Sequence, residues 1–254
     1  MRDLRTAKYE RFRSALQAPF DQEPNRTFPI FTTGRHFDLR DYESESANHE
    51  VEMFVNLVRA CPDELFLDLG CGYRERTFEN CLYLEVYPSR SADLIVEPNC
   101  LYPIRSGTLS GVGCFAVLEH TRKPWLVIEE IARMLKPGGQ VFFLQPVHGY
   151  PSHYFNATRE GLISLFEDNG FKTDMAYTGA HQTAAYTIQW ILGRFAHHLI
   201  DPQLRHDFSR LTVSDMVSMD QQDPVWWKFL NALPPDAFSE LACGNMLVAT
   251  KATT

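Results

Sequence analysis

The chain has 254 residues, of which 44% are hydrophobic and 22% are charged, and its formal net charge is −8. This length and composition are typical of one globular α/β domain with additions. The negative charge argues against a protein that binds nucleic acid without regard to sequence, because such proteins need a basic surface. We therefore expect no nucleic-acid partner.

The first residues and the cysteines indicate the cellular compartment in which the protein works. The first residues, MRDLRTAKYERFR, are charged throughout and do not resemble a secretory signal. No run approaches the ~18 apolar residues of a transmembrane helix. The six cysteines form no CxxC pair and have no metal-like spacing with histidines. We therefore expect free thiols, no metal site, no transmembrane segment and a cytoplasmic protein.

In chain order, residues 1–45 predict a helix followed by an irregular lead-in, because the segment is polar and broken by prolines. Apolar positions recur at helical spacing between Val51 and Val58, and Pro62 follows, which predicts a helix there. The remaining apolar runs predict strands at 65–70, 81–86, 92–97, within 111–120, at 140–147, 171–178 and 245–252, and helices at 124–139 and 158–166. This alternation predicts a mostly parallel sheet covered by helices.

Residues 181–237 interrupt the alternation. They contain an apolar helical stripe and the pair Trp226-Trp227, and the stripe consists of Ile188, Ile191, Leu192, Phe195 and Leu199. We expect a helical insertion between the sixth and seventh strands that acts as a lid or as a homodimer contact. The predicted organisation is a single domain, 1–254, with a lead-in at 1–45, a core at 46–180, the insertion at 181–237 and a closing segment at 238–254.

The stretch LFLDLGCGYRER, residues 65–76, runs from a strand into a glycine turn. A dinucleotide fingerprint would place its third glycine at position 75, but the chain has Glu75, and an acid there would repel a pyrophosphate. The S-adenosylmethionine (AdoMet) pattern, acid-x-Gly-x-Gly-x-Gly, fits Asp68, Gly70 and Gly72 but meets Arg74 at its last position. Because AdoMet has no phosphate, the turn favours AdoMet over NAD.

Glu85 ends the second predicted strand, 17 residues after Asp68. A carboxylate at this place can accept hydrogen bonds from both hydroxyls of a ribose. A solvated acid at the end of a strand is the other interpretation of Glu85.

Two further segments, VLEHTRKPWLVIEEIARMLKPGGQVFF (117–143) and HYFNATREGLISLFEDNGF (153–171), carry a family resemblance. Together with the glycine turn they resemble the class I AdoMet-dependent methyltransferases of the type 11 group, over roughly 65–175 and the closing strand. The segment HGYPSHYF, 148–155, further resembles an uncharacterised bacterial subgroup. The resemblance implies a Rossmann-like, doubly wound, seven-stranded sheet, mostly parallel with an antiparallel last strand, and AdoMet as cofactor.

The resemblance also implies roles for individual residues. The turn would lie under the methionine part of AdoMet, Glu85 would bind the ribose, and further residues would contact the adenine or the methionine chain. The implied cofactor-binding residues are Asp68, Gly70, Cys71, Gly72, Glu85, Val86, Glu97, Phe115 and Ala116. Arg74 and Ser110 depart from the family's pattern. The few residues between Gly72 and the second strand predict a short or irregular first helix.

The chemistry suggests where an acceptor would bind. Methyl transfer to an oxygen needs a base near neutral pH, and histidine is the usual one. His120, His148 and His153 follow predicted strand ends. We expect methyl transfer to a small or carrier-bound acceptor, with O-methylation favoured. The alternatives are a catalytically silent methyltransferase-like binding or scaffold protein and, with less support, an NAD-dependent oxidoreductase.

Overall fold

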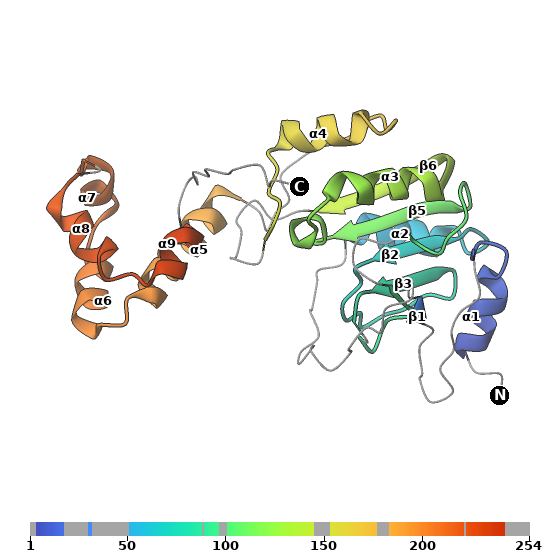
Figure 1. The fold of residues 1–254 in the computed structure, drawn as a ribbon, viewed down its shortest axis with the longest axis horizontal. Coiled ribbons are helices and arrows are strands. Elements are labelled where there is room, and N and C mark those ends of the chain that lie inside the picture. The colour runs from blue at the N-terminus through green and yellow to red at the C-terminus, as the bar shows by residue number, and fades with distance from the viewer. Residues whose placement is uncertain are drawn as a thin grey trace, which may run out of the picture. The chain divides into compact units, whose positions relative to one another are not determined.

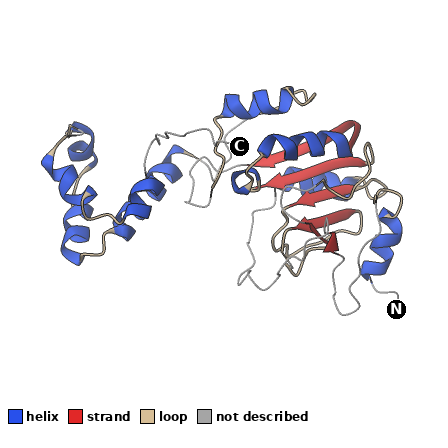
Figure 2. Ribbon diagram, in the orientation of Figure 1, coloured by secondary structure: helices blue, strands red, loops and turns tan. Residues whose placement is uncertain are grey.

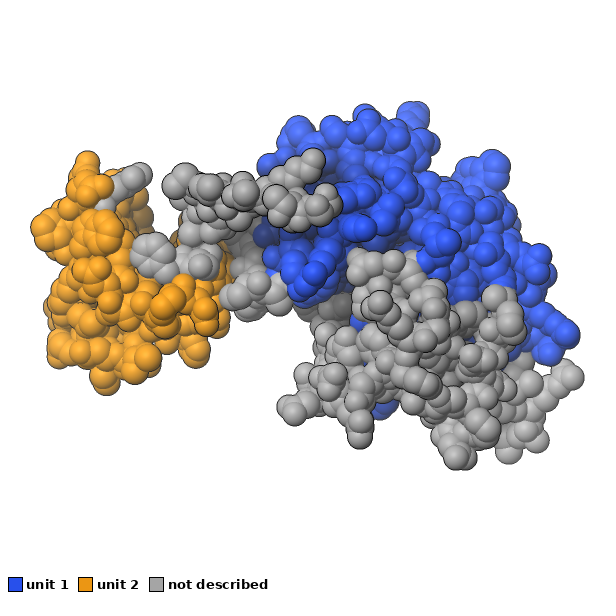
Figure 3. Space-filling view, viewed as in Figure 1, with its two compact units in different colours: residues 1–147, 153–176 blue, residues 148–152, 177–254 orange. Residues whose placement is uncertain are grey.

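The computed structural model describes residues 4–17, 30–31, 51–87, 89–96, 101–144, 153–176, 183–220 and 222–241. The chain divides into two compact units (Figure 3). The first comprises residues 1–147 and 153–176, and the second comprises residues 148–152 and 177–254. The prediction of a single domain stays a prediction.

The first unit is built on a parallel sheet (Figures 1 and 2). Within the described residues its strands are β1 (Ile30–Phe31), β2 (Phe66–Leu69), β3 (Cys81–Glu85), β4 (Leu94–Val96), β5 (Leu109–Phe115) and β6 (Leu135–Leu144). Their order is β1-β4-β3-β2-β5-β6, and each described pair is parallel. The predicted Rossmann-like α/β architecture is therefore confirmed, and the two-residue strand β1 adds an edge that the sequence did not predict.

Burial explains why these segments are strands. Every residue of β2, β3 and β4 is buried, as expected for parallel strands covered on both faces. Leu67 and Leu69 of β2 pack in the same cluster as Ile128 of helix α3 (Pro124–Met134). Phe66 joins the cluster of helix α2 (Glu52–Ala60), where the ring centroid of Phe54 lies 6.3 Å away. The alternation along β2 thus separates two hydrophobic layers.

Helix α1 (Leu4–Phe12) confirms the helix predicted at the start of residues 1–45, and it belongs to this unit. Phe12 is fully buried in the core. The Lys8 ammonium lies 2.8 Å from a carboxylate oxygen of Asp93, and the Tyr9 hydroxyl donates to the Asp93 carbonyl oxygen. The same Asp93 carboxylate accepts from the Tyr83 backbone N–H at 3.0 Å. One buried acid therefore ties α1 to the sheet.

Helix α3 ends earlier than predicted, at Met134 instead of residue 139, and β6 begins at Leu135. The cause lies in the turn before β5, because the N–H groups of Gly107 and Thr108 donate to the carbonyls of Arg133 and Met134, at 2.9 and 3.0 Å. These carbonyls at the helix end are thus satisfied without a glycine stop. The following Lys-Pro-Gly-Gly forms an irregularity in the strand pairing, with Gly138 at φ 78°.

Helix α4 (Arg159–Glu167) confirms the prediction for residues 158–166. The Thr158 side chain accepts from the Gly161 N–H at 3.1 Å, and Gly170 adopts φ 83° just after the helix. The predicted sixth strand is wrong for its described part, because residues 171–176 have no strand structure. A strand needs a ladder of hydrogen bonds to a neighbour, and no described strand pairs with these residues.

The second unit is helical in its described part. Its helices are α5 (Ala184–His198), α6 (Pro202–Ser209), α7 (Val213–Ser218), α8 (Pro224–Leu230) and α9 (Pro235–Leu241). Its core consists of Phe195, Leu199, Phe208 and Phe229, and Trp226 packs edge-on against Phe195. Ile188 and Ile191 are exposed, so only the second half of the predicted apolar stripe lies in this core.

Two further expectations concern a transmembrane segment and the closing strand. None of the helices in the described part of the chain combines the length and hydropathy needed to cross a bilayer. The predicted closing strand at 245–252 lies outside the described residues.

Candidate functional site

The predicted cofactor residues that the structure describes lie at or just beyond the carboxyl ends of β2, β3 and β5. Strands β2, β3 and β4 follow one another toward one side, whereas β5 and β6 lie on the other side of β2. The strand order therefore reverses between β2 and β5, and ligands of open α/β sheets bind outside the carboxyl ends of strands at such a point. Asp68 of β2 and Phe115, the last residue of β5, border it.

The turn after β2 requires its glycines. Gly70 and Gly72 adopt φ 67° and 52°, which is the left-handed region. The N–H groups of Gly70 and Cys71 donate to the Leu84 carbonyl at 2.8 and 3.1 Å. A Cβ atom on Gly70 would lie 2.4 Å from a methyl group of Val117, so the turn packs directly on the segment after β5. The chain therefore passes very close to both neighbouring strands.

Glu85, the last residue of β3, is bonded to this turn. One carboxylate oxygen accepts from the Gly72 N–H at 2.8 Å, and the other accepts from the Val86 N–H at 2.7 Å. The side chain is buried, and burial raises the pKa of its carboxyl group although the two N–H groups oppose this. A solvated acid is therefore the wrong interpretation. Because a carboxylate offers about four acceptor positions, Glu85 retains capacity for a ligand.

Arg74 binds Asp68 in a buried pair. Its Nε donates to one carboxylate oxygen at 2.7 Å and its Nη2 donates to the other at 3.1 Å, and both residues are only 3% exposed. The residue at the position of the missing third glycine thus neutralises the acid at the start of the pattern. Arg74 is therefore a buried, paired residue and not a solvated one. No helix forms between residues 71 and 80, which confirms the expected irregular first crossover.

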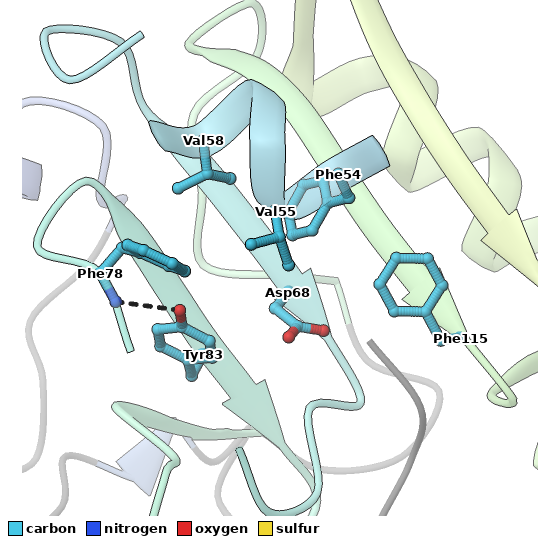
Figure 4. A pocket seen from close by; sticks show the side chains of 7 residues that line it. All are labelled: Phe54, Val55, Val58, Asp68, Phe78, Tyr83 and Phe115. Atoms are coloured by element: carbon cyan, nitrogen blue, oxygen red, sulfur yellow. Dashed lines mark hydrogen bonds between the residues drawn. The ribbon is translucent and has the colours of Figure 1, made fainter. Parts of the chain in front are cut away.

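A small cavity lies beside Asp68 (Figure 4). Its walls are mostly apolar, and it is lined by Phe54, Val55, Val58, Asp68, Phe78, Tyr83 and Phe115. The Tyr83 hydroxyl accepts from the Phe78 N–H at 3.0 Å, which is the dashed contact in Figure 4. The cavity therefore combines aromatic walls with one paired carboxylate.

The end of β5 carries an unusual backbone. Ala116 adopts φ 56°, and among the described residues no other non-glycine residue has a positive φ. Its N–H donates to the Leu144 carbonyl at 2.8 Å, which fixes this conformation. Such outliers cost free energy and often occur at functional sites. The predicted pair Phe115–Ala116 thus lies where the chain bends away from the sheet.

Two predicted bases come together after β5. His120 ends the short 3-10 helix η2 (Leu118–His120), and its ring centroid lies 4.8 Å from that of His153. Burial lowers the pKa of both histidines, and the nearby His120 lowers that of His153 further. The neighbouring Glu119 is 1% exposed, and burial raises the pKa of its carboxyl group to about 7. Ligand atoms of the three residues all lie within 4.8 Å of one another.

Sequence reasoning missed Glu119, although it stands beside His120 in the Leu-Glu-His motif. The signal in the sequence would have been an acid in a short connection that should be buried. Glu119 directly follows the apolar residues Val117 and Leu118 and comes shortly before helix α3. Glu97 and His148, the remaining predicted site residues, lie outside the described residues.

Part of the chain matches the model of a known protein family. Residues 85–143 match the family model described as a methyltransferase domain, of the type 11 group, and this segment runs from Glu85 through β6. The predicted resemblance to the type 11 group of methyltransferases is thereby confirmed over this segment, whereas the resemblance to a subgroup with the HGYPSHYF segment stays a prediction. No curated protein matches the sequence.

Three solved structures are similar at low identity. A chain of the complex between the Haloferax volcanii Trm112 methyltransferase activator and a methyltransferase is 16% identical over 50% of this chain and 75% of that one, with a TM-score of 0.36. The [4+2]-cyclase SpnF is 18% identical over 55% and 65%, with a TM-score of 0.44. The YcgJ protein from Bacillus subtilis is 12% identical over 65% and 91%, with a TM-score of 0.39. Scores below 0.5 carry no functional conclusion.

Proposed function

We propose that the protein is an AdoMet-dependent methyltransferase that acts on a small or carrier-bound acceptor, with an oxygen as the favoured acceptor atom. The observation that carries the proposal is Glu85. It is a buried carboxylate at the carboxyl end of β3, bonded to the glycine turn, and it begins the segment that matches the methyltransferase family.

The charges of the site are compatible with this cofactor. With Glu85 ionised, Asp68, Glu85 and Arg74 together carry one net negative charge, because the Arg74 guanidinium neutralises one carboxylate. AdoMet carries one net positive charge from its sulfonium, ammonium and carboxylate groups. A dinucleotide would bring additional negative charge to the same buried acids, and opposite charges favour binding whereas like charges oppose it.

The cofactor would supply a methyl group on a positively charged sulfur, ready for in-line transfer. In the proposal, Glu85 accepts from the ribose hydroxyls and Val86 lies beside the adenine, with Glu97 accepting from its amino group. The turn of Gly70, Cys71 and Gly72 supports the methionine part, and Phe115 and Ala116 form the wall next to it. These residues exclude water and fix the direction of approach.

The base that removes the proton of the acceptor is proposed to be a histidine that follows a strand. In the proposal, His120 or His153 takes the proton of an acceptor hydroxyl, and His148 is a further candidate. The position of His120 and His153 just beyond the carboxyl end of β5 supports the assignment of these two. We also retain the proposals of a closing antiparallel strand, of 181–237 as an insertion that forms a lid or homodimer contact, and of a cytoplasmic location.

The test is calorimetry with AdoMet and the Glu85→Gln variant. Removing the charge should weaken AdoMet binding by about 1.5–3 kcal/mol, since hydrogen bonds to charged groups contribute about this much. Thermal unfolding of the same variant checks that the turn is intact. Unchanged affinity in a folded variant would contradict the ribose assignment.

One observation favours a second candidate, a silent binding or scaffold protein. Arg74 already satisfies Asp68, so the turn is complete without a ligand. Titration with AdoMet, S-adenosylhomocysteine and NAD separates the candidates. Tight binding of S-adenosylhomocysteine without methyl transfer to any hydroxyl compound in a panel would support the scaffold, and binding of NAD alone would support an oxidoreductase.

A further inference from the structure

The segment after β5 and the segment before α4 are tied together by backbone hydrogen bonds. The Tyr154 and Phe155 N–H groups donate to the Glu119 carbonyl oxygen at 2.6 and 3.4 Å. This contact brings His153 to the short helix η2, although the two lie more than thirty positions apart in the chain. The meeting of the two histidines is therefore fixed by main-chain atoms.

Glu119 projects a charged group into this junction. The residue is 1% exposed, yet neither carboxylate oxygen has a hydrogen-bond partner among the described residues. An isolated buried carboxylate is costly, and unsatisfied buried groups in native proteins usually have an explanation such as an ion. Glu119 contrasts with Glu85, whose oxygens both accept backbone hydrogen bonds.

We propose that Glu119, His120 and His153 bind a divalent transition-metal ion, with Zn²⁺ as the best match. Two imidazoles and one carboxylate are a common ligand set of catalytic zinc sites, which leave a fourth position open. Zinc–ligand bonds of about 2.0–2.2 Å place tetrahedral ligands roughly 3.3 Å apart. The ligand atoms here lie within 4.8 Å of one another. Side-chain rotations that move these atoms by about an ångström would therefore bring them to the spacing that zinc requires.

The fourth position would face solvent, because His120 is exposed and His153 is half-buried. It could take a water molecule or an acceptor oxygen, whose pKa the ion would lower. In the metal-bound form the histidine nitrogens would hold the ion, so the role of base proposed above for His120 or His153 would apply only to the metal-free form. The metal site itself does not depend on methyl transfer, because the three residues define it without the cofactor turn.

The test uses the full-length protein, stripped with a chelator and titrated with Zn²⁺ against a chromophoric competitor. We expect one equivalent to bind, and we expect His153→Asn and His120→Asn each to raise the dissociation constant at least about tenfold. His206→Asn, at an exposed histidine of α6, is the matched control and should bind like the unaltered protein.

Glu119→Gln provides a readout that does not depend on folding defects. It should lose the ion, but without metal it should melt at a higher temperature than the unaltered protein, because the amide removes a buried charge. Cobalt substitution identifies the ligands, since a thiolate-to-cobalt absorption band would indicate cysteines and overturn the assignment. Absence of stoichiometric binding, or binding that the three variants leave unchanged, would overturn it as well.

Discussion

Arg74 donates two hydrogen bonds to the Asp68 carboxylate inside the first unit, and both side chains are almost completely buried. The pair joins the last part of β2 to the crossover that follows it. Arg74 is also anchored through its backbone, because its N–H donates to the Ser91 hydroxyl at 2.7 Å. Arg74 thus fixes the helix-free crossover through both its side chain and its backbone.

Breaking this pair should destabilise the protein. Arg74→Met should lower the free energy of unfolding by about 3–5 kcal/mol, because it leaves Asp68 buried without its main cation. Adding Asp68→Asn to Arg74→Met should recover part of the loss. Urea denaturation followed by tryptophan fluorescence measures both effects. Arg159→Met, which removes an exposed pair with Glu160, is the control and should change little. Equal effects of the two single variants would contradict the buried pair.

Two glycines with nearly the same backbone conformation allow a matched test of the turn. Gly70 and Gly107 have φ 67° and 68°, but a Cβ on Gly107 meets nothing within 4 Å. Gly107→Ala should therefore cost about 1–2 kcal/mol for the left-handed conformation alone. Gly70→Ala should cost about 1–3 kcal/mol more, because Val117 must move. If the urea midpoints of the two variants coincide, the close packing of the turn on Val117 is refuted.

The contact of α1 with the sheet predicts an N-terminal sensitivity. Lys8→Met should lower the free energy of unfolding by about 3–5 kcal/mol, since Asp93 stays buried without its ammonium partner. Arg13→Met removes an exposed ion pair with Glu10 and should have a much smaller effect, below about 1 kcal/mol. Chemical denaturation of both variants decides, and a silent Lys8→Met would show that α1 does not support the sheet.

In the second unit, Glu240 predicts a pH dependence. Its side chain is almost fully buried and bonds to Arg194 at 2.6 and 2.9 Å and to His198 at 2.9 Å. The Arg194 hydrogen bond is the largest cause of a lowered Glu240 pKa. A lowered carboxyl pKa stabilises the fold above the unfolded value of about 4.5, and this stabilisation disappears as pH falls below it.

Glu240→Gln should therefore reduce the urea midpoint at pH 7, and the difference from the unaltered protein should shrink at pH 3.5. Circular dichroism follows the helices of this unit during denaturation. Glu160→Gln, at an exposed carboxylate, serves as the control and should show no comparable pH dependence. A difference that persists at pH 3.5 would contradict a role for the Glu240 charge.

Local chemistry predicted much of the fold. The apolar runs of β2 and β3 specified buried strands, and Thr158 specified the start of α4 because its side chain caps the helix. The end of α3 was not predictable, because its last carbonyls are satisfied by Gly107 and Thr108, which belong to a different turn. Helix propensity depends on the residues of the segment itself, whereas these hydrogen bonds depend on where a different segment packs.

The site followed the same division. Asp68, Gly70 and Glu85 were predictable from spacing, since consecutive parallel strands bring their carboxyl ends to one edge. The partner of Arg74 was not, because a buried arginine and a solvated one have the same sequence signature. The junction of Glu119 with His153 also required the structure, since it depends on hydrogen bonds between distant backbone segments.

The place of Lys8 has a consequence for synthesis of the chain. Lys8 and Asp93 are 85 positions apart, so the acid leaves the ribosome long after the helix that needs it. At about 5–20 residues per second, α1 waits roughly 4–17 s before its partner exists. During that time Phe12 has no core to enter. Helix α1 is thus made well before the part of the sheet that holds it, and it can dock there only after Asp93 has been synthesised.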